Sequence, residues 1–149
     1  MRTSDGVTLV SGLALPYRAG ADTPGVQVRI ARPTRDLAAA RVFYERTVGL
    51  SVVASFEDHD GYSGVVFGLP DASRQLELVF HADVGPAPTA EDQLVLYLGS
   101  DARVSELADA LRAAGHAPRA AANPYWARND AVCFVDPDGY WLVLSPQAW

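Results

Sequence analysis

The clearest helix of this sequence lies in residues 36–50, DLAAARVFYERTVGL. Asp36 is a residue type that caps helix N-termini, because its side-chain oxygen accepts a hydrogen bond from a backbone N–H of the first turn. Gly49 is a residue type that ends helices, since glycine adopts a left-handed backbone without strain. An apolar stripe lies between them, formed by Leu37, Ala40, Val42, Phe43 and Tyr44. The sequence therefore predicts a helix over residues 36–47 with one face against a core.

Strand-like segments flank this helix on both sides. Before it, residues 26–30 alternate apolar and polar side chains, as a half-buried strand does, and Pro33 ends the run. After it come three runs rich in β-branched and aromatic residues, separated by turns that contain glycine, aspartate or proline. These runs are residues 51–56, 62–68 and 75–80. The first half of the chain thus predicts one βαβββ unit.

The same order of elements returns after a proline-bearing connector, residues 85–89. The expected elements are a strand over 93–98, a helix over 104–114 and strands over 117–121, 131–135 and 141–145. Gln27 and Gln93 begin the two opening strands, and Gly49 and Gly115 end the two helices; each pair is separated by 66 residues. Because repetition at a fixed spacing indicates a duplicated structural unit, we expect two tandem modules.

Composition limits the size of the fold and its partners. A chain of 149 residues, 49% of them hydrophobic, can bury one sizeable core but not two independent ones. The net charge of −6 disfavours nucleic acid and anionic membranes. Cys133 lies in an apolar run and predicts an inert buried thiol. Residues 1–25 are rich in glycine and proline, without a targeting or spanning pattern, and predict a leader with at most one short strand in a cytoplasmic protein.

Five short motifs follow one another at set spacings along residues 26–149. They are RDL (35–37), FY (43–44), VGL (48–50), LRAAGH (111–116) and DPDGY (136–140). Together they resemble the glyoxalase/bleomycin-resistance/extradiol-dioxygenase group, the vicinal oxygen chelate superfamily. The segment NPYW (123–126) is similar to a subgroup of bacterial glyoxalase-like proteins. The resemblance implies an α+β fold in which two tandem βαβββ modules, about 26–81 and 93–149, form curved mixed sheets around a cavity.

The resemblance also implies where metal-using members hold their ion, with one ligand from the first strand and one from the last strand of each module. The matching positions are Gln27 and Glu77, then Gln93 and Val143, with Arg29 as an alternative to Gln27. Val143 offers no donor atom, and an amide oxygen is a weak neutral ligand. We therefore expect no cofactor; a divalent metal, if one binds, would use Gln27, Glu77 and Gln93.

Glu77 is the first candidate for chemistry. It lies in a strand that is otherwise largely apolar, where a carboxylate has to be paired or functional, or else its pKa rises. Its role is that of a residual metal ligand, a general base or an ion-pair partner of Arg29. His59, in the turn EDHDG (57–61), is a second candidate base, although the polar sequence of this turn favours a solvated surface turn.

Aromatic side chains are candidates for a ligand-binding wall. Tyr97 and Trp141 share strand faces with Gln93 and Val143, respectively, and Tyr125 and Trp126 lie in a predicted loop before the strand 131–135. Such side chains could stack on a planar ligand, beside polar contacts from the two glutamines and Arg29, or they could fill the core.

Two functions follow from these residues. The incomplete metal-ligand set favours a protein that binds an aromatic or cationic small molecule, similar to the antibiotic-resistance branch of the superfamily, and the resemblance implies a homodimer. The alternative is a lyase, isomerase or dioxygenase-type enzyme that uses a divalent metal at an atypical site or metal-free acid/base chemistry by Glu77. Fold alone does not choose between them.

Overall fold

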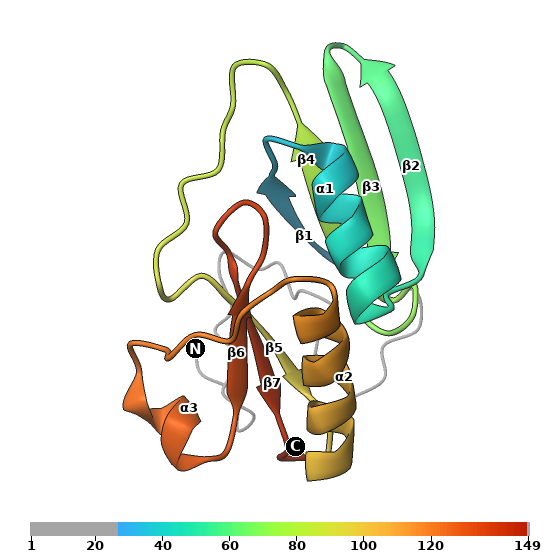
Figure 1. The fold of residues 1–149 in the computed structure, drawn as a ribbon. Coiled ribbons are helices and arrows are strands. Elements are labelled where there is room, and N and C mark those ends of the chain that lie inside the picture. The colour runs from blue at the N-terminus through green and yellow to red at the C-terminus, as the bar shows by residue number, and fades with distance from the viewer. Residues whose placement is uncertain (1–26, 149) are drawn as a thin grey trace, which may run out of the picture.

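The first module is a four-stranded sheet with one helical segment on one face (Figure 1). The computed structural model describes residues 27–148, so the predicted leader lies outside the described residues. The elements are β1 (Val28–Pro33), α1 (Leu37–Arg41), the π-helix η1 (Val42–Val48), β2 (Val52–His59), β3 (Tyr62–Gly68) and β4 (Arg74–Phe80). The strand order is β1-β4-β3-β2, with β1 parallel to β4 and the other pairs antiparallel. The predicted βαβββ order is confirmed.

The helical segment begins and ends where the sequence predicts. The Asp36 carboxylate accepts a hydrogen bond from the backbone N–H of Ala39 at 3.0 Å, and Gly49 has the left-handed φ of 89° that a glycine stop provides. One feature differs from the expected α-helix, because the segment continues as a π-helix after Arg41. Phe43 and Tyr44, which are adjacent in sequence, are both fully buried in this π-helical turn.

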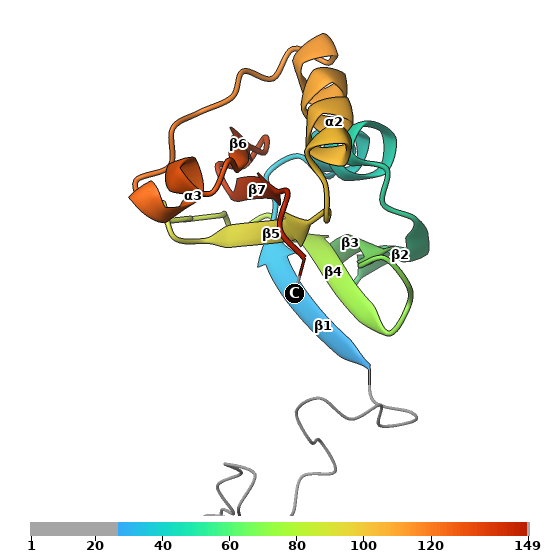
Figure 2. The same ribbon diagram turned by 90° about the horizontal axis from the view of Figure 1, so that it is seen from below.

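The second module has three strands in its sheet and a helix on each face. Its elements are β5 (Gln93–Tyr97), α2 (Asp101–Ala113), α3 (Pro124–Arg128), β6 (Val132–Val135) and β7 (Trp141–Ser145). The strand order is β5-β7-β6, and Figure 2 shows α2 and α3 on opposite sides of this sheet. Helix α2 starts three residues earlier than predicted, because the Ser100 hydroxyl caps it by accepting from the N–H of Arg103 at 3.3 Å.

Two predictions about residues 117–126 are wrong. The expected strand over 117–121 forms only a single bridge between Arg119 and Cys133, and Pro118 beside it lacks the N–H that a sheet ladder needs. The segment 123–126, predicted as a loop, instead begins helix α3. Asn123 caps this helix by accepting a hydrogen bond from the N–H of Tyr125 at 3.0 Å, and Pro124 occupies its first turn.

The duplication has two registers rather than one. The helix-ending glycines, Gly49 and Gly115, are 66 residues apart, but the N-caps Asp36 and Ser100 are only 64 apart. Counting back seven residues from each N-cap reaches Arg29 in β1 and Gln93 in β5. The structural counterpart of Gln93 is therefore Arg29, and Gln27 lies before β1.

The two modules pack through their helices and share one hydrophobic core. Its buried residues come from both modules: Ala40, Phe43, Tyr44, Val65, Phe67, Leu76, Leu78, Val104, Ala108, Leu111, Phe134, Leu142 and Leu144. The turn between β6 and β7 is bound to the first module by polar contacts. The hydroxyl of Tyr44 donates to Asp136 at 2.7 Å, and the backbone N–H of Arg35 donates to Asp138 at 2.9 Å. The modules are therefore joined on the side opposite the free face of the first sheet.

Candidate functional site

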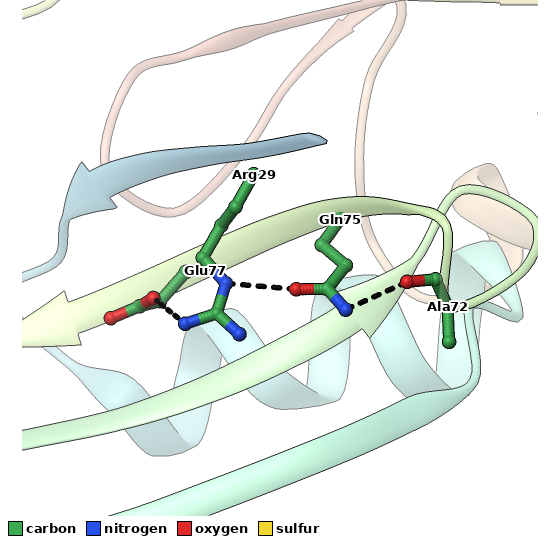
Figure 3. Close-up of polar contacts among 4 residues, drawn as sticks. All are labelled: Arg29, Ala72, Gln75 and Glu77. Carbon is green, nitrogen blue, oxygen red and sulfur yellow. Dashed lines mark hydrogen bonds and ion pairs between the residues drawn. The ribbon is translucent and has the colours of Figure 1, made fainter. Parts of the chain in front are cut away.

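A row of polar side chains crosses the face of the first sheet that helix α1 does not cover (Figure 3). The Arg29 guanidinium donates through Nη1 to Glu77 Oε2 at 2.9 Å and through Nε to Gln75 Oε1 at 2.8 Å. Gln75 and Glu77 are two residues apart in β4, so both point to the same face, and β1 lies parallel beside them. The structure thus brings together the predicted residues Arg29 and Glu77.

The orientation of Arg29 is fixed by its neighbours. The Gln75 amide donates from Nε2 to the backbone carbonyl of Ala72 at 2.8 Å, so its oxygen is left facing the guanidinium. Gln75 was not among the predicted site residues. Its position two residues before Glu77 places both side chains on one face of a strand, which is the sequence signal that could have identified it. Gln75 is buried, whereas the side chain of Arg29 is 48% exposed and that of Glu77 only 13% exposed.

Small and apolar residues surround this polar row. Ala31 of β1 and Val66 of β3 lie opposite Glu77 in the sheet register, and Ala54 of β2 lies opposite Val66. Cross-strand partners share one face, so the carboxylate stands in a line of short side chains. Ala31 and Ala54 are both exposed. Val66 between them is buried, so the accessible short side chains lie at the two ends of this line.

The middle of the corresponding face of the second module is covered by helix α3. Trp126 of α3 packs with Cys133, Val143 and Trp141 on the β5-β7-β6 sheet, and only 8% of its surface is exposed. Its indole Nε1–H donates to Gln93 Oε1 at 3.0 Å. Gln93, Trp126 and Trp141 thus contact one another or the same cluster within the second module, with Trp126 buried and the other two half-buried.

The residues at the family's metal positions do not fit a divalent cation. Glu77, the one carboxylate among these positions, is hydrogen-bonded to the Arg29 guanidinium. Val143 has no donor atom and is fully buried, and the Gln93 amide oxygen accepts a hydrogen bond from Trp126. Within residues 27–148, no group of three or more His, Cys, Asp or Glu side chains is arranged as a metal site. A cation beside Glu77 would also meet the permanent charge of Arg29.

The remaining predicted site residues lie apart from the Arg29 row. His59 is exposed at the end of β2, where it pairs with Tyr62, and Val66 rather than Tyr62 is the β3 partner of Glu77. The β3 partners of His59 and Glu77 are thus four residues apart, about 13 Å along the strand. Gln27 is exposed ahead of β1. No general acid/base pair of His59 and Glu77 is therefore formed.

Tyr97 and Tyr125 are both on the second module and partly exposed. Tyr97 is at the end of β5, on the strand face that it shares with Gln93. Tyr125 donates its hydroxyl to Gln147 Oε1 at 3.3 Å, and its ring lies edge-to-face with Trp126 at 5.1 Å between centroids. Tyr125 therefore holds α3 against the C-terminal segment.

The junction of the modules contains two buried titratable groups, Tyr44 and Asp136, that the sequence did not indicate as a pair. Burial raises the pKa of Asp136, although the hydrogen bond from Tyr44 opposes the shift. Burial also raises the pKa of Tyr44 well above its usual value, and the negative charge of Asp136 adds to this. The Arg32 guanidinium lies over the ring of Tyr140 at 4.7 Å. These groups join the modules, and they lie on the helix side of the first sheet, away from Arg29.

A shallow hollow of about 390 Å³ lies outside the polar row, between the first helical segment and the second module. Its lining includes Asp36, Val42, Phe43, His116 and Pro137. Asp36 is already used as a helix cap, and the ring of His116 packs edge-on against Phe43 at 4.9 Å. Both polar side chains thus have structural roles, so the hollow supports no site.

Comparison with known families finds the same two-module division. Models described as the YycE-like N-terminal domain and the YycE-like C-terminal domain match residues 28–79 and 91–146. The uncharacterized protein YycE of Bacillus subtilis (strain 168) is 36% identical over 120 residues, which is 79% of this chain and 86% of that protein. The described part of the chain contains no helix of the length and apolarity needed to cross a membrane.

Solved structures give the same result for the fold. A YycE protein of unknown function from Bacillus subtilis superposes with a TM-score of 0.79 and 33% identity, covering 83% of this chain and 91% of that one. TnmS3, an antibiotic binding protein from Streptomyces sp. CB03234, has a TM-score of 0.59 and 26% identity, over 80% and 93%. Leishmania major glyoxalase I, at 0.62 and 20% over 80% and 84%, shares the fold. The predicted vicinal oxygen chelate fold is confirmed.

Proposed function

The chain belongs to the YycE-like family of the glyoxalase/bleomycin-resistance superfamily, and we propose that it is a small-molecule-binding protein whose ligand lies on the open face of the first module. One observation carries the proposal: the polar row of Arg29, Gln75 and Glu77 has an exposed guanidinium on an uncovered face, whereas Trp126 covers the middle of the corresponding face of the second module. TnmS3, a similar structure, is an antibiotic binding protein.

The proposed ligand is a planar aromatic compound. The exposed Ala31 beside Glu77 offers a flat ring an apolar contact, and a polar substituent on that ring can reach Arg29 on the same strand face. The expectation of a cationic ligand rests on the acidic balance of the whole chain, and the fixed charge of Arg29 opposes it at this face. Cationic compounds therefore form a separate arm of the test.

A metal-free binding role agrees better with the state of Glu77 than catalysis does. A general base needs its carboxylate available to the substrate proton, and Glu77 already accepts a charge-assisted hydrogen bond from Arg29 at 2.9 Å. No second acid/base group contacts Glu77 within residues 27–148. We therefore propose sequestration without turnover.

The test is a thermal-shift panel of planar aromatic compounds that are cationic, neutral or anionic, run with EDTA and again with Mn²⁺, Ni²⁺ or Zn²⁺. A ligand at 100 times its Kd adds about 2.7 kcal/mol of stability, which raises Tm by several degrees. We expect stabilisation in EDTA and recovery of the ligand unchanged by mass spectrometry. Conversion of the compound that stops in Glu77→Gln would show an enzyme instead, and stabilisation only with metal would contradict metal-free binding.

We further propose that the binding unit is a homodimer. β1 and β5 are both edge strands of their sheets, and Val28 and Ile30 of β1 are 48% and 55% exposed. Exposed apolar side chains on a sheet edge favour association with another chain. Sedimentation equilibrium should give about twice the chain mass of 15.9 kDa, and Ile30→Glu should shift it towards the monomer. A monomer for the unaltered protein contradicts the proposal.

A further inference from the structure

The Arg29 guanidinium has donors to spare on the open face of the first module. Two of its nitrogens make hydrogen bonds, Nε to Gln75 and Nη1 to Glu77. Figure 3 shows its third nitrogen, Nη2, without a contact and directed away from Glu77. Since an arginine side chain carries five N–H groups, three of them are left without a protein partner among the described residues. These three are the remaining N–H of Nη1 and both of Nη2.

The guanidinium is also held still before any ligand arrives. Ala72, Gln75, Arg29 and Glu77 form one chain of hydrogen bonds of 2.8–2.9 Å, which fixes the guanidinium plane from two sides. A preorganised arginine loses little conformational entropy when it binds a ligand. The end of the guanidinium formed by Nη1 and Nη2 offers two parallel N–H groups, which can donate to two neighbouring oxygens of one ligand.

The charge balance of the site narrows the class of ligand. Glu77 offsets the charge of Arg29, so the pair has a net charge near zero at neutral pH. A dianion would meet repulsion from the Glu77 carboxylate, and a cation would meet the guanidinium. A neutral group that presents two oxygens meets neither obstacle, and a single negative charge meets less repulsion from Glu77 than a dianion does.

We propose that the Arg29 guanidinium takes the place of the metal ion for which this chain lacks ligands, and binds a planar compound through two neighbouring acceptor oxygens. The inference rests on the proposed function and names the chemistry of its ligand. Glu77 orients the guanidinium from one side and Gln75 from the other, which makes them positioning residues. The ligand is a carboxylate or a neutral vicinal pair such as a catechol.

Isothermal titration calorimetry in EDTA with four naphthalene probes tests this chemistry. 2-Naphthoate carries a carboxylate and 2,3-dihydroxynaphthalene a neutral vicinal pair of oxygens; 2-(aminomethyl)naphthalene carries a cation, and naphthalene-2-carboxamide only one acceptor oxygen. We expect one or both of the first two to bind at least about tenfold more tightly than the last two, as a bidentate contact gives. Preference for one of the first two identifies the source of the oxygen pair.

Variants separate the forked guanidinium from simple charge. Arg29→Gln and Arg29→Lys should each weaken binding of the preferred probe at least about tenfold, because lysine keeps the charge but lacks the fork. Arg128 is exposed on α3, so Arg128→Gln removes the same charge at a distant position and should change the affinity less than about twofold. Urea midpoints of all three variants confirm that they are folded.

Each contrary result has its own meaning. Equal affinity for all four probes, or full binding by Arg29→Lys, overturns the guanidinium proposal but leaves small-molecule binding intact. The guanidinium proposal also fails if the preferred probe binds only after a divalent metal is added. If the thermal-shift panel finds a ligand while none of the naphthalene probes binds, the oxygen-pair chemistry is wrong. If the panel also finds none, the proposed function fails with it.

Discussion

The two modules have corresponding positions in opposite states. In the first, Arg29 and Glu77 form an ion pair on an open face, and the arginine side chain is 48% exposed. In the second, Val143 is buried against Trp126, which is itself 8% exposed, and half-buried Gln93 accepts a hydrogen bond from its indole. Neither face presents a set of groups suited to a divalent cation: a guanidinium pairs with the carboxylate of the first, and apolar packing surrounds Val143 in the second.

This difference separates stability from recognition. A buried indole contributes several kcal/mol through packing, whereas a half-exposed ion pair is screened by water and contributes little. The covered face of the second module should therefore contribute mainly to the free energy of unfolding. The open face of the first module should contribute mainly to ligand affinity.

The largest expected effect is that of Trp126→Ala. The substitution leaves a cavity over β6 and β7 and removes the donor that satisfies Gln93, so it should lower the free energy of unfolding by about 4 kcal/mol. Urea denaturation followed by circular dichroism measures it. Tyr125→Ala, on the same helix but 36% exposed, is the matched control and should cost about 1 kcal/mol. Equal losses for the two variants would mean that Trp126 does not fill the second face.

Tyr44→Phe tests the junction that the two modules share. It removes the 2.7 Å hydrogen bond that Tyr44 donates to Asp136, and both residues are buried. The free energy of unfolding should therefore fall by about 2 kcal/mol. The same urea titration applies, with the exposed Tyr62→Phe as control. A loss below about 0.5 kcal/mol would show that apolar packing alone joins the modules.

The pH dependence of Asp136 should give a smaller effect at the same junction. Burial raises its pKa in the folded state, so the folded protein binds this proton more readily than the unfolded chain. As the pH falls from 7 through the raised pKa, the free energy of unfolding should therefore increase relative to that of Asp136→Asn. The contributions of Glu45, Asp71 and Asp92, whose pKa values are lowered, cancel in this difference. A difference that is flat with pH contradicts the burial of a titrating carboxyl.

The smallest expected effect on stability belongs to the ion pair of the first module. In a double-mutant cycle of Arg29→Gln and Glu77→Gln, the coupling energy should be below about 1 kcal/mol, because Arg29 is half exposed and screened by solvent. Thermal and urea unfolding measure the cycle. A coupling above about 2 kcal/mol would assign the pair a structural role and weaken the contrast between the modules.

The backbone plan was predictable from local signals. Asp36 and Gly49 delimit the first helical segment as expected, and the alternation in β1 and β4 gave their strands to within three residues. Helix α3 was missed although Asn123 and Pro124 are start signals, because its five residues are too few to show an apolar period. The two-residue difference between the modules left Gln27 and Arg29 as alternative counterparts of Gln93, and the N-cap register of the structure selects Arg29.

The site was predictable only in part. The absence of a donor at Val143 follows from the residue type, and an inward carboxylate at Glu77 calls for a partner. The hydrogen bond from Trp126 to Gln93 depends on how a short helix folds back over a sheet, across 33 residues of sequence. The bond between Tyr44 and Asp136 spans 92 residues. Contacts of this range arise from tertiary packing, for which local periodicity carries no information.

The most direct test of the divergence between the modules is a crystal structure of the protein grown with excess Mn²⁺, with anomalous data collected for manganese. We expect no manganese peak at Glu77, with Arg29 hydrogen-bonded to Glu77 and Gln75 and the Trp126 indole hydrogen-bonded to Gln93. A manganese peak coordinated by Glu77 and Gln93, with Arg29 and Trp126 displaced, would contradict it.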